Sequence, residues 1–153
     1  MLALAGTGPE RESLETQVAT SGLGQHVHLL GRIEEARLPE LYRAAHAFVL
    51  PTRALEGFGM ATAEALASGL PVVATDVGAT SDLLAGCPGA VLVRPGRSDL
   101  LAEALAARLR DRDALQRDGA AARRHAETTL GWDAHVDAVV AAATAAQSAR
   151  RTR

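Results

Sequence analysis

The chain has 153 residues, the length of one ordinary domain and enough to enclose a hydrophobic core. Hydrophobic residues make up 48% of it and charged residues 22%, and the net charge is −2. These values argue against a disordered chain and against a nucleic-acid partner, which would require a basic excess.

Short apolar runs alternate with helical patterns over the first two thirds of the chain. The runs expected to form strands are 2–5, 27–30, 47–50, 71–75 and 90–93, the first of them buried. Of the helices expected between them, the first begins near Pro9 and ends near Gly22 or Gly24, and the others cover 38–45, 60–68 and 81–84. This alternation with short connections predicts an α/β fold, a Rossmann-like parallel sheet with helices on both faces.

Only helices are expected after Pro95. Leucines and alanines at helical spacing mark a first helix from about residue 100 to 109, followed by helices at about 114–128 and 132–148 and a solvated basic tail at 150–153. Asp113 is expected to cap the second helix, and Trp132 to anchor the third by packing. We predict one domain, with residues 1–130 forming a partial nucleotide-sugar-binding domain and 131–153 its C-terminal helix and basic tail.

Cysteine and lysine usage excludes several chemistries. The single Cys87 rules out an internal disulfide and favours a cytoplasmic location. All 16 basic residues are arginine, so neither a lysine Schiff base nor a lysine-bearing P-loop can form. Asp111-Arg112-Asp113 resembles a metal-binding Asp-x-Asp pattern, but its place between two helices favours capping, and we expect no metal site.

The segment 51–60 is the most informative stretch of the sequence. Gly57 and Gly59 flank Phe58 directly before the helix expected to begin at Met60. Parallel α/β sheets bind ligands outside the carboxyl ends of their strands, and exposed amides at a helix N-terminus attract phosphates and other electron-rich groups. The pattern therefore favours an anion or sugar site over a simple turn, which would need one glycine.

Two acids accompany this loop. Glu56 stands at its mouth, and Glu64 lies two helical turns further along, on the same stripe as Gly57 and Met60. Two carboxylates along one site could accept hydrogen bonds from separate hydroxyl groups of an extended ligand. The alternative is that one acid caps the helix and the other forms a salt bridge on its surface.

These residues resemble a known family. Glu56 and Glu64 match the E-x7-E motif of retaining glycosyltransferases of the GT-B fold, family 4, within Glu-Gly-Phe-Gly-Met. The similarity extends through 65–75 and 77–80, and includes 6–9, 30–32 and 92–96. It implies the C-terminal, donor-binding half of a GT-B architecture lacking its first strand, followed by C-terminal helices.

The resemblance also implies roles for individual residues. Glu56, the catalytic candidate, would contact hydroxyls of the donor sugar, and Glu64 would take the ribose hydroxyls. The amides of Phe58, Gly59 and Met60, next to Gly57, would meet the sugar and diphosphate of a nucleotide-diphosphate sugar. The backbone at Arg32 and Ile33 would border the base, and Gly6 and Gly8 complete the donor-binding set. No cofactor or metal is implied besides the donor substrate.

Members of this family transfer the sugar to an acceptor hydroxyl with retention of configuration. They carry an N-terminal domain that holds the acceptor, and an Arg and a Lys that clamp the diphosphate, neither of which this sequence shows. We therefore expect this chain to be inactive alone, and the full-length enzyme to be a candidate for peripheral membrane association. The alternative function is a non-catalytic, truncated or orphan module that binds a nucleotide or another chain.

Overall fold

The computed structural model describes residues 1–151, with side chains described through residue 147. The chain forms two compact units, the first Met1–Leu41 and the second beginning at Tyr42. The boundary predicted from the sequence, between residues 1–130 and 131–153, is not tested by this division and stays a prediction.

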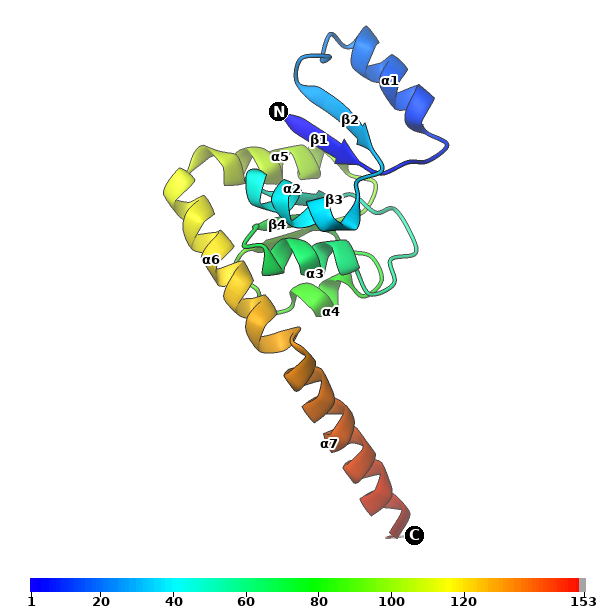
Figure 1. Cartoon of the computed structure of the whole chain (residues 1–153), viewed down its shortest axis with the longest axis vertical. Helices are drawn as coiled ribbons and strands as arrows, with labels where there is room; N and C mark the ends of the chain where they lie inside the picture. Colours follow the sequence, from blue (N-terminus) through cyan, green and yellow to red (C-terminus); the bar gives the residue numbers. More distant parts are fainter. Residues whose placement is uncertain (152–153) are drawn as a thin grey trace. The chain divides into compact units, whose positions relative to one another are not determined.

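The element order agrees with the sequence patterns (Figure 1). The first unit contains β1 (Leu2–Ala5), α1 (Arg11–Thr20), β2 (Val27–Gly31) and a 3-10 turn (Glu35–Arg37), and the unit boundary falls within α2 (Leu38–Ala44). The second contains β3 (Phe48–Leu50), α3 (Met60–Ala67), β4 (Val72–Thr75), α4 (Thr80–Leu84), β5 (Ala90–Val93), α5 (Ser98–Arg110), α6 (Arg112–Thr129) and α7 (Trp132–Arg151). All predicted strands and helices are confirmed in order and type, and α1 begins two residues later than expected.

The strands form two parallel sheets. β1 pairs with β2, and β3, β4 and β5 form a three-stranded sheet with β4 in the centre. The predicted parallel α/β class is therefore confirmed, with its strands distributed over two sheets.

The core of the second unit surrounds β4, whose four residues are all buried. Val72 and Ala74 belong to a cluster that includes Ala65 and Leu66 of α3. Val73 is 1% exposed and, because side chains alternate along a strand, faces the opposite side of the sheet. There α5 contacts β4 and β5, so helices cover both faces of this sheet.

The first unit is much less enclosed, since none of its residues is buried. The expectation that residues 2–5 form a buried strand is wrong, because Leu2 is 44% exposed. A two-stranded sheet and one helix offer too little apolar surface to enclose a strand.

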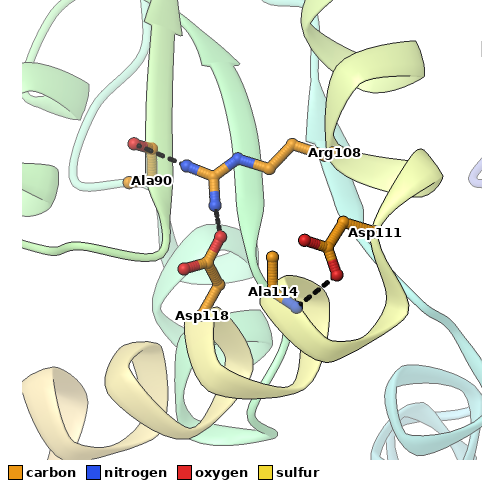
Figure 2. Close-up of polar contacts among 5 residues, drawn as sticks. All are labelled: Ala90, Arg108, Asp111, Ala114 and Asp118. Atoms are coloured by element: carbon orange, nitrogen blue, oxygen red, sulfur yellow. Dashed lines mark hydrogen bonds and ion pairs between the residues drawn. The ribbon is translucent and has the colours of Figure 1, made fainter.

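α6 closely approaches the loops around the three-stranded sheet. An added Cβ at Gly119 would lie 2.3 Å from the carbonyl oxygen of Gly69, and one at Gly89 would lie 2.4 Å from that of Asp118. Arg108 of α5 pairs with Asp118 of α6 and donates to the Ala90 carbonyl at 3.4 Å (Figure 2). This pair therefore joins two helices to the edge strand β5.

The start of α6 corrects one detail of the sequence analysis. Asp111, and not Asp113, is the N-cap residue, and its Oδ1 accepts a hydrogen bond of 2.9 Å from the Ala114 amide (Figure 2). Asp113 lies in the first turn, where its charge interacts favourably with the helix dipole. Capping by Asp111 and the dipole interaction of Asp113 thus account for both acids at the start of α6.

α7 presents exposed apolar side chains. Trp132, predicted as a packing anchor, is 82% exposed and contacts His135 edge-on, so that prediction is wrong. Val136, Val139 and Val140 are also more than half exposed. The backbone is helical through Arg151, and the remainder of the predicted tail, 152–153, lies outside the described residues. Within residues 1–151, no helix has the length and apolar character needed to cross a membrane.

Candidate functional site

The loop between β3 and α3 adopts the glycine-dependent conformation that its sequence suggests. Gly59 is the N-cap residue of α3 and has a φ of +83°. This conformation favours glycine, and a Cβ added there would also crowd the side chain of Leu83 at 3.2 Å. Gly57 has open space around it, and Phe58 is 56% exposed. The fold therefore accounts for the glycine at position 59, but nothing in the packing accounts for the glycine at position 57.

The start of α3 has open amide groups. The helix begins without a side-chain cap hydrogen bond. The first N–H groups of an α-helix have no partner within the helix. The amides near Met60 can therefore donate to a ligand, with the positive end of the helix dipole behind them.

Glu56 is half-buried beside this loop. Its Oε2 accepts a 3.2 Å hydrogen bond from the Thr52 hydroxyl. An added Cβ at Gly78, whose φ is +58°, would lie 2.1 Å from the Glu56 carbonyl oxygen. The turn after β4 thus lies directly against the backbone of Glu56. In the loop that carries Glu56, the preceding residue, Leu55, has a φ of +62°, which is rare for a residue with a side chain. Two loops together fix the position of this acid.

Glu64 is also half-buried, on α3. Its Oε2 accepts a 3.0 Å hydrogen bond from the Tyr42 hydroxyl. Burial, and then the hydrogen bond and charge of Glu64, raise the pKa of Tyr42 to about 12. Neither Glu56 nor Glu64 caps a helix or forms an ion pair among the described residues, so the alternative of a capping acid and a salt-bridged acid finds no support there.

The remaining predicted site residues lie in the first unit. Gly6 and Gly8 follow β1, and Arg32 and Ile33 follow β2. These strands are parallel neighbours, and the Gly6 amide donates to the Gly31 carbonyl at 2.8 Å. The structure therefore brings these four residues to the carboxyl edge of one sheet, while Glu56 to Met60 and Glu64 belong to the other unit.

Three further residues contribute to this site without having been given a role from the sequence: Tyr42, Thr52 and Gly78. Thr52 and Gly78 lie within the segments 51–60 and 77–80 that the sequence indicated. A glycine in the short loop between β4 and α4, three residues after the strand ends, is a recognisable signal for Gly78. No local signal identifies Tyr42, because it lies 22 positions from the acid it contacts.

Other candidate chemistries lack geometric support. No group of three or more His, Cys, Asp or Glu side chains is arranged for a metal ion in the described part of the chain. Cys87 is buried, and its burial raises the pKa of its thiol, which disfavours the reactive thiolate.

A cavity of about 290 Å³ opens at the carboxyl ends of the three-stranded sheet. Its lining includes Pro51 after β3, Thr75 at the end of β4 and Gly96 after β5. The guanidinium-bearing residues Arg53 and Arg97 also line it. The segment that contains the candidate site therefore borders a cavity at the sheet edge where parallel α/β folds bind ligands.

Comparison with known proteins gives a consistent result. The family model for glycosyl transferases group 1 matches residues 1–125. The phosphatidyl-myo-inositol mannosyltransferase of Mycobacterium leprae is 36% identical over 131 residues, which are 86% of this chain and 34% of that protein. This chain spans about a quarter to a third of the length of the curated relatives it matches.

Solved structures show the same fold. Anabaena HepE in complex with UDP-glucose has a TM-score of 0.74 and 27% identity, covering 82% of this chain and 35% of that one. The C-terminal domain of the group 1 glycosyl transferase LpcC from Francisella tularensis has a TM-score of 0.73 and 26% identity, covering 82% of this chain and 66% of that one.

These likenesses confirm the predicted fold class, a parallel α/β domain like the C-terminal domains of GT-B glycosyltransferases. The match of the family model over most of the sequence establishes the relationship directly. The chain belongs to the glycosyl transferases group 1 family.

Proposed function

We propose that this chain is the donor-binding part of a retaining glycosyltransferase that takes a nucleotide-diphosphate sugar. The observation that carries the proposal is that two half-buried acids, Glu56 and Glu64, and the open amides at the start of α3 all belong to the β3–α3 loop and the helix that follows it. Glu56 and Glu64 each accept one described hydrogen bond, from Thr52 and Tyr42 respectively. Each carboxylate keeps further acceptor capacity for the hydroxyls of a ligand.

The chemistry assigned to these groups is binding and charge stabilisation. Glu56 accepts from hydroxyls of the donor sugar, and Glu64 accepts from the ribose. The amides of Phe58, Gly59 and Met60 donate to the sugar and diphosphate, where fixed donors stabilise the charge that develops on the leaving group. The phosphate then helps to deprotonate the acceptor hydroxyl, so neither acid has to act as a nucleophile or general acid.

Several partners belong to this proposal. The UDP-glucose complex of HepE supports a nucleotide sugar as ligand. The acceptor would be held by a domain outside this chain, with peripheral membrane association of the full-length enzyme. We propose a cytoplasmic location and no requirement for a metal, a further cofactor or nucleic acid.

Calorimetry with UDP-, GDP- and ADP-sugars tests the proposal. At least one nucleotide sugar is expected to bind the chain and raise its melting temperature. The substitution Glu64→Gln should weaken that binding by about 1–3 kcal/mol, because a charge-assisted hydrogen bond is lost. Glu103→Gln, which changes an exposed acid on α5, is the matched control and should bind like the parent.

Two outcomes would count against parts of the proposal. Absence of binding to every nucleotide sugar would contradict donor binding, and equal affinity of Glu64→Gln and parent would remove Glu64 from the site. We also expect no sugar transfer by this chain alone, and turnover with a simple acceptor would disprove that expectation.

A further inference from the structure

Tyr42 is held in place by two contacts of different kinds. Its hydroxyl donates to Glu64 Oε2 at 3.0 Å. Its ring packs edge-on against Phe48, the first residue of β3, with centroids 6.0 Å apart and an interplanar angle of 66°. The ring is therefore fixed against the sheet while the hydroxyl reaches the acid on α3.

Glu64 has a rigid backbone but a flexible side chain. The next two residues of α3, Ala65 and Leu66, are fully buried against the sheet, so the helix cannot shift easily. A free glutamate side chain samples several rotamers and loses conformational entropy when a ligand immobilises it. The hydrogen bond from Tyr42 orders the carboxylate before any ligand arrives, which reduces this cost of binding.

A tyrosine hydroxyl suits the orientation of the Glu64 carboxylate better than a cationic side chain would. An arginine could bind both carboxylate oxygens in a bidentate pair and cancel their charge. Tyrosine has one O–H donor, so it occupies one of about four lone-pair sites and leaves the negative charge intact. The other oxygen, Oε1, remains available as an acceptor.

We propose that Tyr42 is a positioning residue that orients the Glu64 carboxylate so that Oε1 accepts from the ribose hydroxyls of the donor nucleotide. This inference rests on the proposed function of Glu64. Tyr42 itself does not touch the nucleotide, and it acts only through the acid.

The test compares ribose and deoxyribose nucleotides. Calorimetry measures binding of UDP and GDP, and of their 2′-deoxy counterparts, to the parent, Tyr42→Phe and Glu64→Gln. Tyr42→Phe should weaken binding of the ribonucleotide about three- to tenfold and leave the deoxynucleotide nearly unchanged, because only the ribonucleotide uses the oriented carboxylate fully. Adding Tyr42→Phe to Glu64→Gln should cause little further loss, since Tyr42 acts only through the carboxylate that Glu64→Gln has already removed.

Thr52→Val is the matched control. It also removes a hydroxyl that donates to an acid, but that acid is Glu56. The ratio of ribonucleotide to deoxynucleotide affinity should stay at the parent value in this variant. A change in that ratio equal to that of Tyr42→Phe would overturn the specific link to Glu64.

The remaining outcomes distinguish a failure of this inference from a failure of the proposed donor-binding function. If Tyr42→Phe weakens both nucleotides equally, or neither, Tyr42 has only a structural role and the inference is wrong, while donor binding stands. If the parent binds no nucleotide, the proposed function fails and the inference fails with it.

A second measurement needs no substitution. The chain contains one tyrosine, so incorporation of 3-fluorotyrosine places a single fluorine label beside the hydroxyl in question. The fluorine resonance should shift on saturation with the ribonucleotide and shift much less with the deoxynucleotide. An unchanged resonance in the ribonucleotide complex would contradict the proposal even if Tyr42→Phe failed to fold.

Discussion

The phenol of Tyr42 offers a direct probe of the candidate site. Its pKa is raised to about 12, chiefly by burial and secondly by the hydrogen bond to Glu64. The chain has one tyrosine, and all its basic side chains apart from histidine are arginine, so no lysine titrates in the same range. Absorbance of the phenolate therefore reports this one group.

We predict that Glu64→Gln lowers the pKa of Tyr42 without returning it to its ordinary value of about 10, because the burial remains. Titration by absorbance measures the shift, and Glu103→Gln should leave the titration unchanged. If Glu64→Gln and the parent titrate together, the hydrogen bond is absent in solution.

The same pKa shift predicts a change in stability with pH. Because the folded-state pKa lies above the unfolded one, the stabilisation is complete below about pH 10 and is lost as the pH rises toward 12. Tyr42 is only half-buried, so solvent screening reduces the loss to about 1 kcal/mol. Urea unfolding at pH 9 and pH 11 should show this extra loss in the parent and not in Tyr42→Phe.

At the scale of elements, α6 depends on a glycine in its interior. Alanine is favoured over glycine in a helix by about 1 kcal/mol. A Cβ at Gly119, however, would lie 2.3 Å from the Gly69 carbonyl oxygen, and backbone atoms cannot swing aside as a side chain can. The close approach of α6 to the loop at Gly69 therefore requires glycine at position 119, although helix propensity alone would favour alanine.

We predict that Gly119→Ala lowers the free energy of unfolding by about 1–3 kcal/mol, measured by urea titration. Ala120→Gly, at the exposed neighbouring position, is the control and should cost about 1 kcal/mol through propensity alone. An unchanged or higher stability for Gly119→Ala would show that α6 does not pack this closely.

Local elements were largely predictable. Glycine and proline positions and hydrophobic periodicity located each strand and helix to within a few residues, and the loop at Gly57 to Met60 lies where the sequence indicated. The exposure of Trp132 was not predictable, because it depends on whether another element covers that face of α7.

Across the whole molecule, burial differs sharply between the two units. No residue of Met1–Leu41 is buried, whereas every residue of β4 is. Local opening requires little free energy where few apolar groups are enclosed.

We predict that amides of β1 and β2 exchange with solvent about a hundredfold or more faster than those of β4, measured by hydrogen–deuterium exchange. The partly exposed strand β5 serves as an internal reference, with intermediate rates. Equal protection of β2 and β4 would show that the first unit is stabilised by more than its own contacts.

The sequence by itself determined the order of the elements, the parallel α/β class and the loop and acids of the candidate site, because these depend on periodicity, turn residues and neighbours along the chain. Only the tertiary structure decided that Tyr42 holds Glu64, that Gly78 lies against Glu56, and that β4 is enclosed while β1 is not. Each of these depends on contacts between residues distant in the chain, which packing alone brings together.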